Sequence, residues 1–240
     1  MSEILSPTSR ATGSPSLRRA LLWFAAAFLS VAAESVTALD RLAQAPFFRD
    51  GAWLISRKFH ESHKLLAYTA PKIIIVSAGL ALLAVFILAS IRCPLKARLK
   101  KWKGPALAAV LSLALVPLAV AALKSSTGVY GPFDLAVYGG SRPHVGYFGA
   151  LLGSGATSGG GSFPAGHASG GFALSSLGAL PTRRNLQRAL FWLGILAGWA
   201  MGIYQMARGE HFLTHTLTTM FLALGIINFL QRLILKPMTP

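Results

Sequence analysis

Long apolar stretches separated by short polar gaps dominate the pattern of this sequence. A helix needs roughly 20 mostly apolar residues to cross the hydrocarbon core of a bilayer, and about 17 to 25 is the usual range. Four stretches meet this requirement, and a fifth is longer, with polar residues only near its start. These five stretches are residues 20–38, 73–91, 105–123, 189–206 and 212–235. The pattern therefore predicts an all-α protein of the membrane.

A sixth stretch, residues 165–180, is shorter and rich in Gly and Ser, and Pro164 and Pro181 flank it. Because proline is favourable at the first position of a helix, we interpret this stretch as a helix that starts below the level of the lipid head groups. The predicted fold is a six-transmembrane-helix bundle within residues 20–240, after a cytoplasmic N-terminal tail at residues 1–19. We expect the first span to be retained, because its apolar run is too long for a signal peptide.

The segment between the first two spans, residues 40–72, mixes large apolar side chains with charged ones. Its apolar residues include Phe47, Phe48, Trp53 and Leu54. This mixture suits an amphipathic segment that lies on the outer membrane interface. A connecting hairpin is the alternative interpretation, and the sequence leaves both open.

Composition supports the membrane assignment. The chain has 53% hydrophobic residues, 12% charged residues and a mean hydropathy of +0.55, which leaves too few polar side chains to cover a soluble globule. A net charge of +16 in a soluble protein would suggest nucleic acid, but here the basic residues lie beside apolar runs, where lipid head groups are the nearer anions. No nucleic-acid recognition motif accompanies them. The single cysteine, Cys93, excludes an internal disulfide.

The basic residues also orient the predicted spans. They occur before the first span, between the second and third, between the fourth and fifth, and near the end of the chain. These residues are Arg18, Arg19, Arg92, Lys96, Arg98, Lys100, Lys101, Lys103, Arg183, Arg184, Arg188, Arg232 and Lys236. A six-span topology puts all of them on one side, which the positive-inside rule makes the cytoplasm.

Three polar stretches then face the other side of the membrane. They are Lys124 with GPFDL at residues 131–135, SFPAGHASGG at 162–171, and RGEHFLTH at 208–215. Ionisable groups at helix ends in a bilayer are costly unless they pair or act on something, so these stretches are the candidate functional residues.

In the second stretch, the glycine-rich run before Pro164 lets the backbone come close to a ligand. The free amides at the predicted helix start can bind an anion. A helix N-terminus also disfavours a positive charge, so His167 should give up a proton readily, which suits a general acid. The alternative is a helix cap with a solvent-facing histidine.

In the third stretch, His211 and His215 are four residues apart, which predicts that they share one helix face, with Arg208 about one turn earlier. A histidine nucleophile needs its far ring nitrogen held by an acceptor, and a neutral His215 can be that acceptor. Zinc is the competing use of paired histidines, with His167 as a third ligand. The order of the zinc proteases places Glu directly after the first His, whereas Phe212 stands here. We therefore expect no metal and no other cofactor.

Lys124 ends the third span, where a lysine that reaches back to the interface needs no function. Asp134 and Arg142 are expected on the same side as the two histidine stretches. A phosphate clamp is therefore the stronger interpretation, because cations and helix-end amides stabilise charge on a phosphoryl group during transfer.

Taken together, these motifs resemble the three-part signature of the type 2 phosphatidic acid phosphatase superfamily. The resemblance implies hydrolysis of a lipid phosphate through a phosphohistidine, without metal. It implies that His211 is the nucleophile and that His167 protonates the leaving oxygen. Lys124 and the amides around Ala165 and Gly166 would bind the phosphate, with Arg142 as a further clamp residue.

The sequence departs from the family pattern at four positions. Gly131 stands for the arginine of an Arg-Pro pair, Ala165 for serine, Gln205 for arginine and His215 for aspartate. We expect Arg208 to replace the arginine from one turn later, with Gln205 and Asp134 in supporting roles. A hydroxyl from Ser162 or Ser169 can replace the lost serine.

The bacterial lipid A phosphatase type is the closer resemblance, which implies a bacterial inner-membrane protein with its site facing the periplasm. The substrates that fit are lipid A, an isoprenoid diphosphate and phosphatidylglycerophosphate, and transfer to another lipid stays open beside hydrolysis. No partner besides membrane lipids and the substrate is expected, and the sequence does not define an oligomeric state.

Two other functions fit parts of the sequence. A rhomboid-like intramembrane protease would use Ser169 as nucleophile and His211 or His215 as its base. In such a protease Lys124 and Arg208 would have no role in the reaction. A non-catalytic transporter or scaffold is the second alternative, although no inverted repeats or paired broken helices are evident.

Overall fold

The computed structural model describes residues 16–36, 38–91, 96–151 and 160–235, and they are mostly helical. The long helices are α1 (Leu17–Val36), α4 (Ala70–Ser90), α6 (Lys103–Thr127), α9 (Arg184–Ala207) and α10 (Leu213–Ile234). The shorter helices are α2 (Leu39–Gln44), α3 (Arg57–Lys64), α5 (Lys96–Leu99), α7 (Tyr147–Leu151) and α8 (Gly166–Ala173). A two-stranded antiparallel hairpin pairs β1 (Phe48–Arg49) with β2 (Ala52–Trp53).

Several tighter or wider turns complete the chain. A π-helical turn, η1 (Leu65–Thr69), joins α3 to α4. The 3₁₀ turns are η2 (Lys100–Trp102), η3 (Pro132–Asp134), η4 (Ala136–Tyr138) and η5 (Leu174–Ala179). Of these, η5 continues α8 without a break.

Four helices of the described residues are long and apolar enough to cross a membrane. These stretches are Arg57–Ser90, Ala97–Asp134, Arg184–Ala207 and Leu213–Ile234, and the second contains α6 with the turns on either side of it. They match four of the six predicted spans. The other two predicted spans correspond to α1 and to α8 with η5, which are outside this set, so that the count of six stays a prediction.

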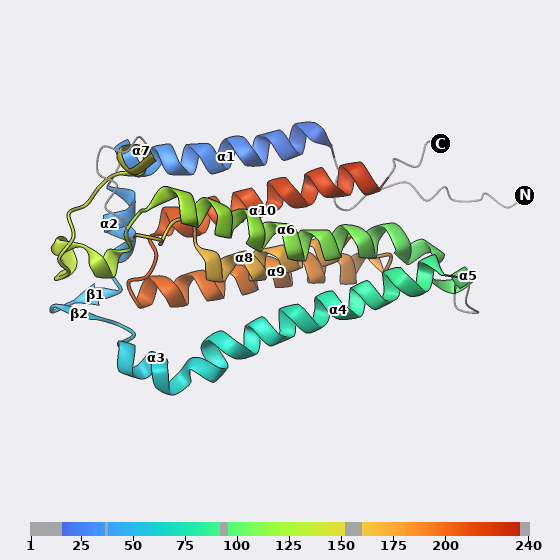
Figure 1. The fold of residues 1–240 in the computed structure, drawn as a ribbon, viewed down its shortest axis with the longest axis horizontal. Coiled ribbons are helices and arrows are strands. Elements are labelled where there is room, and N and C mark those ends of the chain that lie inside the picture. Colours follow the sequence, from blue (N-terminus) through green and yellow to red (C-terminus); the bar gives the residue numbers. More distant parts are fainter. Residues whose placement is uncertain (1–15, 37, 92–95, 152–159, 236–240) are drawn as a thin grey trace, which may run out of the picture.

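The long helices lie side by side along the longest axis of the molecule (Figure 1). α1 packs along α10, and α4 packs along α6. At one end lie α2, α3, α7 and the β-hairpin, together with the C-terminal ends of α6 and α9 and the N-terminal end of α10 (Figure 1). We call this end the motif end, because the three polar stretches lie there.

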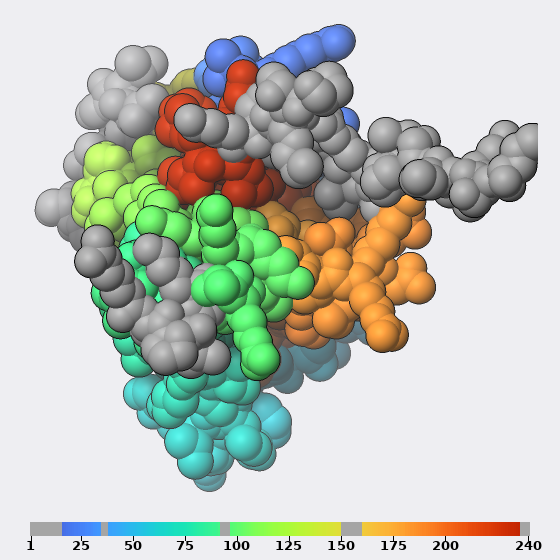
Figure 2. All heavy atoms as spheres, turned by 90° about the vertical axis from the view of Figure 1, so that its right-hand side faces the viewer, coloured from blue at the N-terminus to red at the C-terminus, as the bar shows by residue number. Residues whose placement is uncertain are grey.

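The opposite end of the bundle is formed by α5, the starts of α6 and α9, and the end of α10 (Figure 2). The described basic residues from the predicted cytoplasmic gaps belong to these elements and to the start of α1. These described residues therefore lie at one end of the bundle, and their place on one side of a membrane stays a prediction. We call this the basic end.

The core is centred on α8, which α6, α9 and α10 surround. Val116, Phe172, Ile195 and Leu224 pack together there, and Phe172 is completely buried. The approach of α8 to α9 requires glycine on α8, because a Cβ at Gly171 would lie 2.5 Å from the backbone nitrogen of Gly198 on α9. The small residues of α8, which weaken its resemblance to an ordinary membrane span, thus allow close contact between helix backbones.

Residues 40–72 contain the hairpin that the sequence offered as one alternative, flanked by short helices. This segment is attached to the C-terminal end of α9. Gln44 Nε2 donates to the carbonyl of Met206 at 2.7 Å, and the Ile55 amide donates to the carbonyl of Ala207 at 3.0 Å. Residues 40–72 therefore lie beside the start of the third polar stretch.

Candidate active site

Backbone hydrogen bonds bring the three polar stretches together at the motif end. The Ser162 amide donates to the Val129 carbonyl at 2.8 Å, which joins the first stretch to the second. The Phe133 amide donates to the Gly209 carbonyl at 2.7 Å, which joins the first to the third. Segments about 80 residues apart in the sequence are thus held in one unit of backbone, as the motifs require.

Lys124 lies against the start of α8. It belongs to the last turns of α6, which ends at Gly128 in the left-handed region at φ 60°. A Cβ at Gly161 would be 3.7 Å from Lys124 Cε, and one at Gly166 would be 4.0 Å from Lys124 Cδ. Lys124 therefore lies beside the start of α8, and its binding of a phosphate together with Gly166 stays a prediction.

The first turn of α8 offers its amides to a ligand. Ala165 is the N-cap, and its methyl group makes no capping hydrogen bond. A serine at an N-cap would accept hydrogen bonds from these amides. With alanine at this position, the N-cap side chain accepts no hydrogen bond from the first amides of α8.

His211 lies in the loop between α9 and α10, and only 5% of its surface is exposed. The prediction that it shares a helix face with His215 is wrong, because α10 begins at Leu213 after a turn at Gly209, whose φ is +75°. The two rings are close nevertheless, with centroids 5.6 Å apart. Proximity thus comes from the loop and not from helical spacing.

Burial holds the pKa of His211 well below its ordinary value, and the nearby charges of His215 and Lys124 lower it further. Two smaller effects act on the same pKa: the Ser162 carbonyl raises it and His167 lowers it. Neutral imidazole keeps a lone pair for attack. Within the described residues, the Nδ1 atom of His211 is buried and has no hydrogen-bond partner.

His215 is completely buried in the first turn of α10. Its Nδ1 atom lies 2.7 Å from the carbonyl oxygen of Ser162. Because a carbonyl only accepts, Nδ1 carries the proton and Nε2 of the neutral ring is an acceptor. That Nε2 atom is also buried without a partner in the described part of the chain. Three aromatic rings, Tyr147, Phe163 and Phe212, surround His215 with centroids 5.4 Å away.

Arg208 is held by its neighbours and is mostly buried, with 13% of its side chain exposed. Its Nη1 donates to Gln205 Oε1 at 2.7 Å, and its Nη2 lies 3.1 Å from Glu210 Oε1. Gln205, at the position of the family's arginine, therefore orients Arg208. The Nε atom of Arg208 is buried and unpaired among the described residues, which leaves one donor for a ligand.

His167 lies on the first turn of α8, half-buried, against residues that the sequence did not single out. Its Nε2 lies 3.3 Å from the carbonyl oxygen of Ala67. Its ring is stacked on Tyr68, with centroids 4.5 Å apart and planes 10° from parallel. Both contacts come from the π-helical turn η1.

No arginine could stand at Gly131 in this packing. A Cβ there would lie 2.5 Å from the Glu210 carbonyl oxygen and 2.9 Å from Ser162 Oγ. The departure from the family pattern at this position is therefore built into the contact between the three stretches.

Arg142 and Asp134 were predicted beside the phosphate, and their described contacts lie elsewhere. Arg142 is exposed, with its guanidinium 5.2 Å from the centre of the Tyr130 ring. Its amide donates to the Asp134 carbonyl at 2.8 Å. Among the contacts within the described ranges, none joins either side chain to His211, so their predicted roles stay predictions.

Ser169, the nucleophile of the protease alternative, already uses its hydroxyl in a hydrogen bond. Ser169 is 1% exposed, and its hydroxyl donates to the Gly166 carbonyl at 2.6 Å, within its own helix. A hydroxyl that caps its own backbone is not presented to a histidine base. The geometry therefore favours the histidine pair as the reactive unit.

The sequence did not identify Asp40, Thr214 or Tyr147, which support the start of α10. Asp40 is buried and accepts from the Thr214 amide at 2.9 Å and from the Thr214 hydroxyl. The Tyr147 hydroxyl lies 2.8 Å from Thr214 Oγ1. Burial raises the pKa of Asp40, and the bonds from Thr214 oppose that shift. Thr214 lies within the third polar stretch, but its partners Asp40 and Tyr147 come from distant segments that no local pattern marked.

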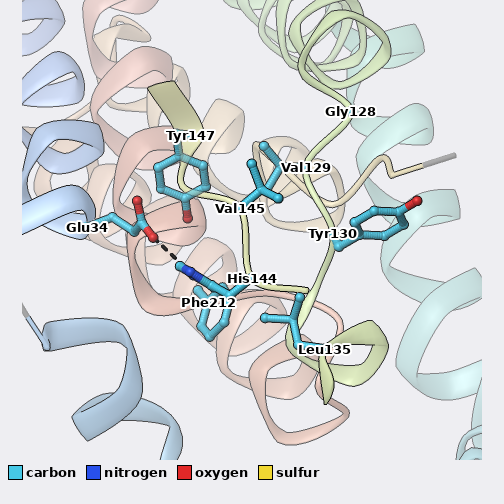
Figure 3. Close-up of a pocket in the computed structure, with 9 residues that line it drawn as sticks. All are labelled: Glu34, Gly128, Val129, Tyr130, Leu135, His144, Val145, Tyr147 and Phe212. Carbon is cyan, nitrogen blue, oxygen red and sulfur yellow. Dashed lines mark ion pairs between the residues drawn. The ribbon is translucent and has the colours of Figure 1, made fainter. Parts of the chain in front are cut away.

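A small pocket adjoins the histidine site on the side of Phe212. Figure 3 shows His144 pointing toward Glu34, which lies on α1, with Phe212 and Tyr147 nearby. His144 Nε2 is 3.2 Å from Glu34 Oε1. This hydrogen bond raises the pKa of His144, against the effect of partial burial. A larger cleft of about 790 Å³ continues from there past Asp40 and Tyr138.

The chain matches the sequence model of the PAP2 superfamily over residues 105–238. Neither the curated proteins nor the solved structures compared with it gave a match. The matched range covers more than half of the 240 residues and includes all three polar stretches. The chain therefore belongs to the PAP2 superfamily, as the motifs around Lys124, His167 and His211 predict.

Proposed function

We propose that this chain is an integral-membrane phosphatase that cleaves a lipid phosphate or diphosphate through a phosphohistidine on His211. One observation carries the proposal. The buried atoms Nδ1 of His211 and Nε2 of His215 have no partner in the described ranges, and their rings are 5.6 Å apart. Membership of a family of membrane phosphatases supports the reaction class.

The hydrogen bond of His215 determines which atom of His211 reacts. His215 Nδ1–H donates to Ser162, so His215 Nε2 is free to accept from His211 Nδ1–H. The spacing of the rings allows that bond once the two nitrogens face each other. His211 Nε2 then keeps its lone pair for phosphorus. In this chain a neutral histidine does the orienting work of the family's aspartate.

The phosphate is proposed to lie between Lys124, Arg208 and the first amides of α8. Lys124 lies against Gly166, and Arg208 has an unpaired buried Nε. These groups supply positive charge and N–H donors to the phosphoryl oxygens, whose charge they stabilise in the transition state.

The reaction then takes two displacements. His211 Nε2 attacks phosphorus in line, the bond from phosphorus to the leaving oxygen breaks, and His167 gives that oxygen a proton. Water next attacks the phosphohistidine while His167 takes back a proton. The products are the alcohol, or the shorter phosphate, and inorganic phosphate. Discharge to a lipid hydroxyl in place of water would make the enzyme a phosphotransferase.

We further propose that α1 and α8 with η5 complete a six-span bundle in a bacterial inner membrane, with the basic end in the cytoplasm. The segment of residues 40–72 would then lie at the outer interface. Its exposed leucines support this placement: Leu42 is 71% exposed and Leu54 is 69% exposed, whereas Asp40 and Gln44 of the same segment are buried. Lipid would reach the phosphate site from the outer leaflet.

Phosphate release from defined lipids tests the proposal. Purified protein in detergent is given lipid A, an isoprenoid diphosphate or phosphatidylglycerophosphate, beside His211→Ala and Ser169→Ala. We expect His211→Ala to abolish release and Ser169→Ala to retain it, and the preferred lipid to show the highest kcat/KM. The reverse result for the two variants would support the protease-like site instead.

The covalent intermediate needs its own measurement. An acid-labile phosphoenzyme should accumulate in a single turnover with labelled substrate and should be missing in His211→Ala. Full activity in a strong chelator is expected for chemistry without a metal. Release that proceeds without any trapped phosphoenzyme would contradict the histidine mechanism.

A further inference from the structure

The π-helical turn between α3 and α4 contacts the proposed general acid from outside the three family motifs. Its residues Ala67 and Tyr68 hold two different parts of His167. The Ala67 carbonyl oxygen lies 3.3 Å from Nε2, and the Tyr68 ring is stacked on the imidazole at 4.5 Å. No other described aromatic ring is stacked on His167.

The turn is wider than an α-helix by one residue. The amide of Ala70 donates to the carbonyl of Leu65, five residues earlier, which is the π pattern. Single π turns of this kind occur mostly within α-helices and often at functional sites. The side chains of this turn have different neighbours: Leu65 and Leu66 are 68% and 71% exposed, whereas Ala67 and Tyr68 contact His167 and Tyr68 is 39% exposed.

We propose that Tyr68 is a positioning residue for His167, and that η1 makes Nδ1 of His167 the atom that donates a proton to the leaving oxygen. This inference rests on the proposed phosphatase function. Because a carbonyl oxygen only accepts, the bond to Ala67 requires a proton on Nε2. The proton that reaches the leaving oxygen must therefore come from Nδ1, and the neutral ring left behind has its lone pair there, ready to activate water.

The stack with Tyr68 fixes the plane in which Nδ1 points. An imidazole attached through two rotatable bonds can otherwise turn about both, and a general acid works only within hydrogen-bond reach of its target. A nearly parallel ring contact at 10° restricts this rotation without using the polar atoms of the histidine. The Ala67 carbonyl also stabilises the doubly protonated ring, since it accepts from the charged form.

η1 is itself anchored to the bundle near Arg208. His60, on α3 just before the turn, is buried, and its Nδ1 lies 2.9 Å from the Tyr204 hydroxyl of α9. On the other side of the turn, Ile75 of α4 lies against Gly170 of α8. The position of Tyr68 is therefore defined from both sides of η1.

Dependence on the leaving group tests the inference. An alkyl phosphate needs a proton on its leaving oxygen, whereas a nitrophenyl phosphate has a leaving group that departs without one. The quantity to compare is kcat/KM, because it reports the steps up to loss of the leaving group. We expect Tyr68→Ala to lose about 10²-fold on the alkyl ester and less than about threefold on the nitrophenyl ester. Tyr68→Phe, which keeps the stack, should retain activity on both.

Two further variants calibrate the result. His167→Ala should show the same selective loss on the alkyl ester, and Leu66→Ala, on the exposed side of the same turn, should change neither rate. Equal losses on both esters in Tyr68→Ala would overturn the positioning role, as would a His167→Ala enzyme that does not discriminate between them. Failure of the phosphatase proposal is separate, since it would appear as phosphate release that survives His211→Ala.

Discussion

The carboxylate of Asp40 accepts hydrogen bonds from both the amide and the hydroxyl of Thr214, although 174 residues separate them in the sequence. Thr214 lies in the first turn of α10, so Asp40 supplies the cap that Phe212, the N-cap residue, lacks. A negative group at a helix N-terminus is stabilising. The helix start that carries His215 and follows His211 is thus held in place by a residue from outside the matched family region.

Asp40→Asn should therefore destabilise the protein and reduce its activity. Asparagine keeps one acceptor oxygen, but turns an NH₂ toward the donors of Thr214. We expect a loss of about 1–3 kcal/mol in the free energy of unfolding, measured by thermal denaturation in detergent, with lower kcat. Asp50→Asn, at an exposed turn, is the matched control and should change neither quantity. Unchanged stability in Asp40→Asn would show that the cap is not needed.

Replacing His215 by aspartate, the residue of the family pattern, should reduce activity. In His215→Asp the Ser162 carbonyl, which now accepts from Nδ1 at 2.7 Å, would face a carboxylate and repel it. His215→Ala removes the orienting group altogether, and we expect kcat to fall by about 100-fold or more in both variants, with less phosphoenzyme trapped. An aspartate variant as active as the parent would show that Ser162 does not select the histidine.

Gln205 and Arg208 should behave as one unit in a double-mutant cycle. Gln205→Ala releases the guanidinium and should lower kcat/KM by about tenfold, and Arg208→Ala by about 100-fold. Because Gln205 acts through Arg208, the double variant should be no worse than Arg208→Ala alone. Inhibition by inorganic phosphate should weaken in parallel. Additive losses would mean that Gln205 has a separate task.

The pair of His144 and Glu34 should make stability depend on pH. The pKa of His144 is raised in the folded protein, chiefly by its hydrogen bond with Glu34. Its contribution is therefore complete below the unfolded value of about 6.5 and is lost as the pH rises through the higher folded value. The melting temperature of Glu34→Gln should lie below that of the parent at pH 5.5, and the gap should narrow toward pH 8.5.

The size of that effect should be modest, because the His144 side chain is 53% exposed and solvent screens its charge. Glu61→Gln is the control: Glu61 pairs with Lys64 at 3.5 Å on the surface, and lysine does not titrate in this range. A gap that stays constant with pH in Glu34→Gln would argue against a protonated His144.

The four long spans could be predicted from sequence closely, and the reason is physical. The apolar stretch 212–235 became α10 at Leu213–Ile234, because the length and composition of such a stretch alone decide whether it can cross a bilayer. Lys124, His167 and His211 were recognisable because their residue types and spacing belong to a family motif. The placement of His211 on a helix failed, because Gly209 at φ +75° ends the helical turn before it.

Ala67 and Tyr68 could not be predicted as part of the site. Their contact with His167 depends on the π-helical turn η1. It also depends on packing against α8 and α9, which are 100 or more residues away in the sequence. Asp40 could not be predicted either, because its contact with Thr214 also depends on packing between distant segments. A pattern of hydrophobic residues records local periodicity, whereas these contacts are set by packing between distant segments.

The length of α6 has a consequence for the bilayer around the protein. Lys103 and Lys124 are the two basic residues of this helix, 21 residues apart. At about 1.5 Å per residue they lie about 32 Å from each other along the axis, close to the hydrocarbon thickness of about 30 Å. In the proposed membrane placement one lysine lies at each interface, so that the length of α6 matches the thickness of the hydrocarbon core. Lipids with much shorter or longer acyl chains should displace the phosphate site from the head-group plane, and turnover of embedded substrate should peak where chain length and helix agree.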